Sequence, residues 1–248
     1  MAFAAILLAT IAATIVFRDS LKRQAKWWYR GAAALEILYA AGVVFELPDV
    51  LWSPLYLLMQ QATLAMALFV IVMFIGALPP AGKLARMLRP IRTELSILAC
   101  ILVVGHMIVY LLCIPRLFTG GLVTAQVLCG FIVAVLLTVL LAVLGPTSAE
   151  SLKRRLGARR WKAIQRSAYL FYGFTYLHLM LVLMPSIEQG VVPAMVTAAV
   201  YTVVFAVYAV ARVARAVSEA RGFNFAMGHS DTVGQEFDEP LHNVAMGR

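Results

Sequence analysis

Residues 95–114 read LSILACILVVGHMIVYLLCI, and residues 168–184 read AYLFYGFTYLHLMLVLM. Each stretch is almost wholly apolar and carries one histidine near its middle, His106 in the first and His178 in the second. A helix that crosses a lipid bilayer needs about 20 predominantly apolar residues. Both stretches are therefore predicted to be transmembrane helices, each with a histidine at membrane depth.

The rest of the chain has the same apolar character. Of its 248 residues, 62% are hydrophobic and 13% are charged, and its mean hydropathy is +0.88. This composition is too apolar for a soluble domain. The predicted fold class is all-α, a polytopic membrane helix bundle with seven transmembrane helices. The predicted spans are residues 1–17, 31–47, 55–78, 95–114, 121–145, 168–184 and 191–211.

The basic residues predict how these helices are oriented. Short loops rich in Lys and Arg stay in the cytoplasm, and such a cluster, residues 18–30, follows the first span. With that loop inside, all 21 Lys and Arg except Arg116 fall on the cytoplasmic side. We therefore expect the N-terminus outside and the C-terminus in the cytoplasm. The net charge of +9 indicates topology and contact with a bilayer of anionic lipid, and nucleic acid is not implied.

The two histidines are predicted to lie at nearly the same depth. His106 comes 14 residues after Arg92, and His178 comes 12 residues after Arg166. At a rise of 1.5 Å per residue, His106 and His178 lie roughly 21 and 18 Å along their helices from these inner charges. Ionisable side chains are costly inside a bilayer and usually mark a functional site, so one ligand between two helices is expected.

Haem iron is the best candidate for that ligand, because neutral imidazole is its usual nitrogen ligand. Gly105 and Gly173 are small enough to let a macrocycle approach the backbone. In the alternative interpretation, each histidine only donates a hydrogen bond to a neighbouring helix. A zinc or copper site is disfavoured, because no carboxylate or third histidine is expected at that level.

Other polar residues in the spans have weaker functional interpretations. Arg116, beyond His106 on the same helix, either reaches back to haem propionates or anchors the outer interface. Glu36 is expected near the inner edge, paired with a basic loop or, less favoured, relaying a proton from quinol. Gln60, Gln61 and Gln126 are expected to make hydrogen bonds between helices.

Two longer segments contain these histidines, RPIRTELSILACILVVGHMIVYL at 89–111 and GPTSAESLKRRLGARRWKAIQRSAYLFYGFTYLH at 145–178. In their order of basic loop, histidine helix, Thr-Ser and Arg-Trp segment, they resemble the ferric-reductase-like transmembrane superfamily. The greatest similarity is to the haem-binding membrane subunit of the bacterial periplasmic methionine sulfoxide reductase system. On this basis the chain divides into residues 1–54, two N-terminal helices, residues 55–211, the haem-binding core, and residues 212–248, a cytoplasmic tail.

The resemblance implies a b-type cytochrome in the bacterial cell membrane, with His106 and His178 as the ligands of one haem b. It implies an electron-transfer subunit of an oxidoreductase, with a quinol or a cytoplasmic flavin reductase as donor. The acceptor would be an extracytoplasmic reductase or flavoprotein. Relatives often have a further histidine 13 residues before the second ligand, where this chain has Gln165, and Thr93 holds the same position before His106. A second haem is therefore not expected, and FMN at the inner face, for which no motif is present, stays open.

Two other functions remain open at this stage. In the first, the chain is itself a stand-alone transmembrane reductase that acts directly on ferric iron or another small oxidant. In the second, it is a transporter or a structural membrane protein without redox activity, an alternative that the lack of paired Gly or Pro breaks and of an inverted repeat disfavours.

Overall fold

In the computed structural model, the described residues are 2–45, 47–79, 81–119 and 124–236, without the side chains of 113–119, 150 and 221–236. These residues form helices and no strand, so the predicted all-α class is confirmed for this part of the chain. The N-terminal half contains α1 (Ala2–Val16), α2 (Arg18–Arg23), α3 (Ala25–Val44), α4 (Asp49–Leu55), the π-helix η1 (Tyr56–Gln60), α5 (Thr63–Ala77) and α6 (Lys83–Leu88). The rest contains the 3₁₀-helix η2 (Arg89–Ile91), α7 (Arg92–Leu102), α8 (Val104–Thr119), α9 (Ala125–Thr147), α10 (Glu150–Gln165), α11 (Ser167–Glu188) and α12 (Val192–Glu236).

Within the described residues, five helical segments are long and apolar enough to cross a membrane, which makes the chain a multi-pass membrane protein. They are Asp49–Ala77, Lys83–Leu112, Ala125–Thr147, Ser151–Glu188 and Val192–Ala220, and they confirm the last five predicted spans. The first two predicted spans differ from these. α1 is shorter, and α3 contains Arg30 and Glu36, which lower its apolar character.

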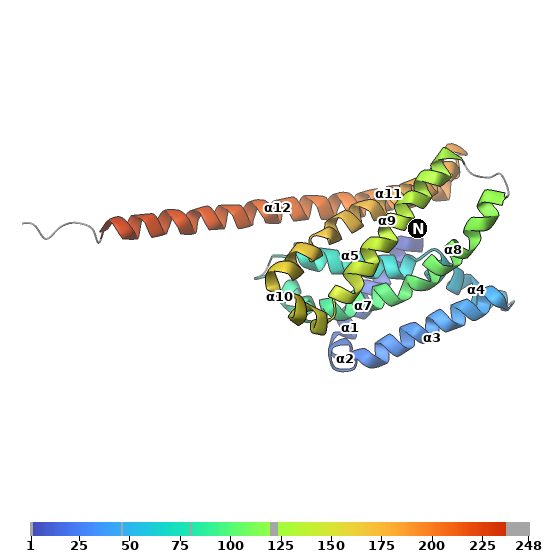
Figure 1. The fold of residues 1–248 in the computed structure, drawn as a ribbon, viewed down its shortest axis with the longest axis horizontal. Helices are drawn as coiled ribbons and strands as arrows, with labels where there is room; N and C mark the ends of the chain where they lie inside the picture. The colour runs from blue at the N-terminus through green and yellow to red at the C-terminus, as the bar shows by residue number, and fades with distance from the viewer. Residues whose placement is uncertain (1, 46, 80, 120–123, 237–248) are drawn as a thin grey trace, which may run out of the picture.

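Helix α5 forms the centre of the bundle. It packs against α1, α7 and α12, and 61% of the most apolar window in its span is buried, against 11–22% in the other four spans. A helix that is apolar on every face is stable only where it is covered on every face, by protein or by lipid. The chain therefore leaves most of the surface of the other four spans uncovered, as expected for helices that face lipid, while α5 is surrounded by other helices (Figure 1).

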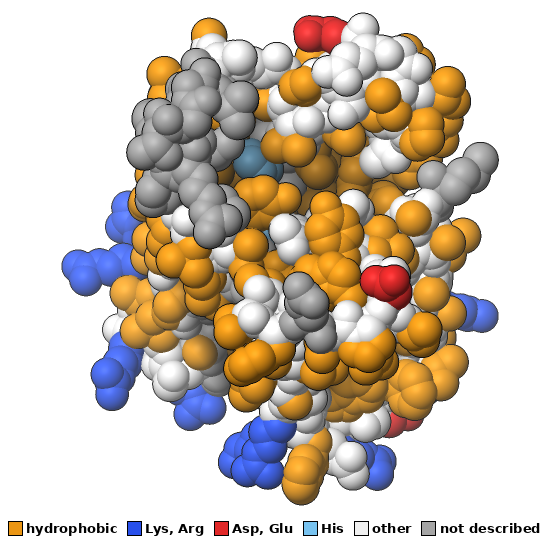
Figure 2. Space-filling model, turned by 90° about the vertical axis from the view of Figure 1, so that its right-hand side faces the viewer, with side chains coloured by type: hydrophobic (Ala, Val, Ile, Leu, Met, Phe, Trp, Pro, Cys, Tyr) orange, Lys and Arg blue, Asp and Glu red, His pale blue; other side chains and the backbone are white. Residues whose placement is uncertain are grey.

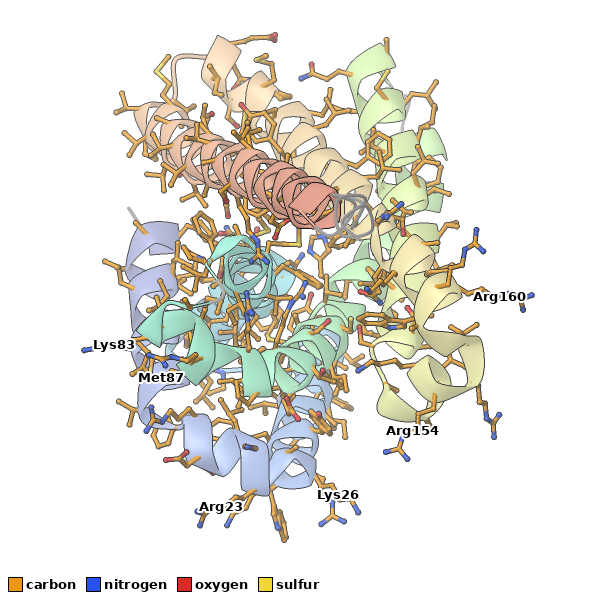
Figure 3. All side chains as sticks on the ribbon, turned by 90° about the vertical axis from the view of Figure 1, so that its left-hand side faces the viewer. Arg23, Lys26, Lys83, Met87, Arg154 and Arg160 are labelled. Atoms are coloured by element: carbon orange, nitrogen blue, oxygen red, sulfur yellow. The ribbon has the colours of Figure 1, made fainter. Side chains whose placement is uncertain are left out.

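The basic segments gather at one end of the molecule. Figure 3 shows Arg23, Lys26, Lys83, Arg154 and Arg160 at the edge of this end, with their side chains directed away from the bundle. The opposite end is mostly hydrophobic, with Lys and Arg only at its rim (Figure 2). This segregation of charge is the pattern that the loop charges predict for a protein with one cytoplasmic face.

Helix α12 is longer than its predicted span. It continues from Val192 to Glu236, and its C-terminal part projects beyond the bundle (Figure 1). Much of the predicted tail, residues 212–248, is therefore helical, and residues 237–248 lie outside the described residues.

Candidate functional site

His106 lies at a break between two helices. α7 ends at Leu102, Val103 turns, and α8 begins at Val104, so His106 stands in the first turn of α8. Its imidazole is half-buried and lies beside the ring of Tyr110, with 4.7 Å between the ring centroids.

A second backbone break lies opposite His106. The π-helix η1 ends at Gln60, and Ala62 has a left-handed backbone conformation with φ of 50° before α5 begins. Such a break frees carbonyl groups from helical hydrogen bonding, and inside a membrane each freed group needs another partner. The hydroxyl of Thr63 donates to the Leu57 carbonyl at 2.6 Å, and Nδ1 of His106 lies 2.6 Å from the Gln60 carbonyl oxygen.

This second hydrogen bond determines the tautomer of His106. A carbonyl oxygen only accepts hydrogen bonds, so Nδ1 of His106 carries the proton and donates it. Nε2 then keeps its lone pair. Metal-bound histidines are often oriented in the same way: one ring nitrogen donates a hydrogen bond to a backbone carbonyl, and the other coordinates the metal.

His178 lies near the middle of α11, on the side of the bundle formed by α9 and α11. Gln126 joins these helices through its Nε2, which donates to the Leu181 carbonyl at 3.2 Å. A Cβ at Gly130 would lie 3.9 Å from Leu181, which is an ordinary van der Waals contact, so α9 and α11 lie side by side here without requiring glycine. The Gly130 backbone also lies beside the His178 ring, yet the buried Nδ1 has no hydrogen-bond partner among the described residues.

The fold brings the two histidines together from separate packing groups. α8 packs on η1, α3 and α7, whereas α11 packs on α9, α10 and α12. The His106 and His178 rings are near enough that a charge on one would act on the other. Figure 2 shows a recess at the end opposite the basic loops, with histidine surface at its floor. Since these are the histidines whose side chains the structure describes, the recess opens onto at least one of the pair.

Gly105 has a different neighbour from the one predicted. A Cβ at this position would clash with the Glu36 carboxylate and would lie 2.8 Å from the Tyr39 ring, both on α3. Gly105 therefore permits contact between α3 and α8. Gly173 differs, because no atom lies within 4 Å of the position that its Cβ would occupy.

The predicted location of Glu36 is wrong. Its carboxylate lies against the Gly105 backbone, next to His106, instead of at the inner edge, and no ion pair of Glu36 occurs among the described residues. Its Oε1 is buried without a hydrogen-bond partner. A carboxylate therefore does share the level of His106, contrary to expectation, because α3 is offset along the bundle relative to α7 and α8. Even so, no group of three or more His, Cys, Asp or Glu in the described part could hold a metal.

The predicted interhelical hydrogen bonds of two glutamines are confirmed. Gln60 accepts at Oε1 from the Tyr39 hydroxyl at 3.3 Å, in addition to the bond of its carbonyl with His106, and Gln126 bonds to α11. The Gln60 carbonyl is the functional group that the sequence did not indicate. The side chain of Arg116 lies outside the described residues.

Thr93 and Gln165, which lie 13 residues before His106 and His178, line one cavity at the basic end of the bundle. Gln165 donates from Nε2 to the Thr147 hydroxyl at 3.0 Å. This cavity is separate from the recess seen in Figure 2, which lies at the opposite end.

Comparison with known proteins gives one informative similarity. The chain is 39% identical over 170 residues to a protein of Treponema pallidum (strain Nichols) that is named only as an uncharacterized protein. The match covers 66% of this chain and 46% of the relative, so the chain spans about half the length of the relative it matches. No protein-family model and no solved structure matches the chain.

Proposed function

We propose that this protein is a b-type cytochrome membrane subunit that carries electrons across the bilayer, with His106 and His178 as the residues that would hold one haem. The observation that carries the proposal is the state of the two rings. His106 is held by the Gln60 carbonyl with Nε2 left as an acceptor, and the buried Nδ1 of His178, beside the Gly130 backbone, has no hydrogen-bond partner among the described residues. An unsatisfied buried polar atom is costly, and a bound group that coordinates this nitrogen would relieve that cost.

The donor set fits haem chemically. Two imidazoles from different helices, His106 and His178, would suit the iron of a haem, for which imidazole is a common protein ligand. When bound, haem iron supplies one-electron redox chemistry. The chain's contribution is to orient His106 through Gln60, to place His178 within an apolar helix pair, and to keep the site in a medium of low polarity.

The direction of transfer and the partners are further parts of the proposal. The basic end is proposed to face the cytoplasm, where a flavin reductase would dock or a membrane quinol would donate electrons. The recess at the opposite end would then face an extracytoplasmic reductase or flavoprotein in a bacterial cell membrane (Figure 2). This assignment is supported by the segregation of charge and by the family resemblance of residues 89–111 and 145–178.

The experiment is the absorption spectrum of the protein purified in mild detergent. We expect a low-spin b-type spectrum for the wild type and loss of that spectrum in His106→Ala and in His178→Ala. His242→Ala, in the C-terminal tail, is the matched control and should keep the wild-type haem content. Full haem content in either of the first two variants would refute the ligand assignment, and a colourless wild-type protein would favour a transporter or structural role.

A further inference from the structure

The cavity at the basic end has a volume of about 420 Å³ and lies where α5, α7, α9, α10, α11 and α12 meet. We refer to it as the inner cavity. Its size is within the range of small-ligand pockets, roughly 300–1,000 Å³. Four of its lining residues are cationic, namely Arg89, Arg92, Lys153 and Arg215.

Three of these cations gather around the C-terminal end of α5. Arg215 donates from Nη1 to the carbonyls of Gly76 and Leu78 at 2.8 and 2.5 Å, and Arg89 donates to the same Leu78 carbonyl at 3.3 Å. Helix ends of this polarity favour cations, so Arg215 and Arg89 have a structural role there.

Arg92 has no such role. Its guanidinium lies over Gly76, where Nη2 would be 3.5 Å from a Cβ, and it makes no hydrogen bond or ion pair with any described residue. Arg89 and Arg215 are near enough for their charges to act on it. Glu219 pairs with Arg215 at 2.7 Å, which leaves an excess of positive charge around the cavity. Clustered arginines without enough carboxylate partners favour a bound anion.

Neutral donors line the same space. The hydroxyls of Ser96 and Ser148 lie 3.3 Å apart, and Thr93 and Gln165 are also in the lining. Lys153 lies over the Trp161 ring, 5.2 Å from its centroid, and Trp161 is itself held by a bond of 3.0 Å from Nε1 to the Thr147 carbonyl. Guanidinium, ammonium and hydroxyl donors around one space are complementary to an oxyanion with several acceptor oxygens.

We infer that the inner cavity is a binding site for a phosphate group, with Arg92 as its principal contact. The inference goes beyond the proposed cytochrome function and does not require a haem. Phosphate at the basic end has two sources, the headgroup of an anionic membrane lipid and a soluble phosphate compound from the aqueous side. Both present the same chemistry to Arg92, and the experiment distinguishes them.

Trp161 provides the signal for the test. The full-length protein, delipidated in a neutral detergent, is titrated with inorganic phosphate, with sodium chloride at matched ionic strength as control. A parallel titration uses dioleoylphosphatidylglycerol, with dioleoylglycerol as the control lacking phosphate. We expect a saturable change in tryptophan fluorescence with phosphate or with the phospholipid, and loss of that change in Trp161→Phe. Tighter binding of the phospholipid identifies a lipid headgroup, and tighter binding of inorganic phosphate identifies a soluble source.

Two arginine variants separate a built site from general surface charge. Removing a charge-assisted hydrogen bond weakens binding by about tenfold or more, so Arg92→Gln should bind at least that much more weakly. Arg160→Gln changes an arginine at the periphery of the same basic end (Figure 3) and should bind phosphate like the wild type. Ser96→Leu fills the cavity without removing charge and should abolish binding. This variant tests the site independently, in case Arg92→Gln does not fold. The inference is overturned by no saturable change with either titrant, or by equal weakening in Arg92→Gln and Arg160→Gln.

Discussion

The Nδ1 atom of His106 lies 2.6 Å from the carbonyl oxygen of Gln60, so that one helix break supplies the hydrogen-bond partner of a histidine at another. Both helix breaks contribute to this contact. The turn at Val103 places His106 in the first turn of α8, and the left-handed Ala62 ends the π-helix that presents the Gln60 carbonyl. Irregular backbone is tolerated in a membrane only where its polar groups find partners within the protein. The hydrogen bond between His106 and the Gln60 carbonyl therefore stabilises the broken backbone of this region and also fixes the orientation of the His106 ring.

The conformation of Ala62 gives a prediction for stability. A non-glycine residue in the left-handed region costs roughly 1–2 kcal/mol, and glycine avoids most of this cost while losing about 0.5–1 kcal/mol through its greater freedom when unfolded. We expect Ala62→Gly to be as stable as the wild type or up to about 1 kcal/mol more stable. Ala62→Val should be less stable by more than about 1 kcal/mol. Thermal unfolding in detergent measures both, and a Val variant as stable as the Gly variant would contradict this account of the backbone.

Gly105 and Gly173 form a matched pair for the second prediction. Gly105→Ala places a methyl group against Glu36 and 2.8 Å from Tyr39, and overpacking of this kind costs about 1–3 kcal/mol. Gly173→Ala meets no atom within 4 Å and should be neutral or stabilising by about 0.5–1 kcal/mol through helix propensity. The two melting temperatures should therefore shift in opposite directions or at least differ clearly. Equal shifts would show that α3 is not packed against α8 at Gly105.

Glu36 provides the third prediction. Its carboxylate has a buried oxygen without a partner and no ion pair among the described residues. An unpaired charge in such a place is unfavourable, whereas a neutral amide of the same shape loses no salt bridge. We therefore expect Glu36→Gln to unfold at the same temperature as the wild type or a higher one at neutral pH. A marked loss of stability would mean that Glu36 is ion-paired in the membrane, as the sequence first indicated.

Glu36→Gln also tests the proton-relay hypothesis. In proteoliposomes with a quinol donor, a residue that receives the quinol proton should slow quinol oxidation when it is replaced by Gln. Glu219→Gln, which alters only an exposed ion pair with Arg215, is the control and should leave the rate unchanged. A wild-type rate in Glu36→Gln would end the relay hypothesis without affecting the ligand assignment of His106 and His178.

Particular residues show how far the sequence could predict the structure. The spans that contain His106 and His178 are predictable because the length of an apolar stretch is set by bilayer thickness. The level of Glu36 is not, because counting residues along one helix gives no information about the offset of α3 relative to α8. The Gln60 carbonyl is also hidden, since the break at Ala62 occurs in an apolar stretch without a glycine at that position. Backbone breaks of this kind depend on tertiary partners such as His106.

Arg215 provides the last prediction, on the stability of the basic end. Its guanidinium donates to two carbonyls at the end of α5, Gly76 and Leu78, and pairs with Glu219. Loss of these bonds leaves carbonyls of the central helix without this partner, at a cost of about 1–3 kcal/mol for each such group that stays buried. Arg215→Ala should therefore unfold at a clearly lower temperature than the wild type, and Arg160→Ala, which removes an exposed arginine, should not. If both variants unfolded at the wild-type temperature, the attachment of α12 to α5 through Arg215 would contribute little to the fold.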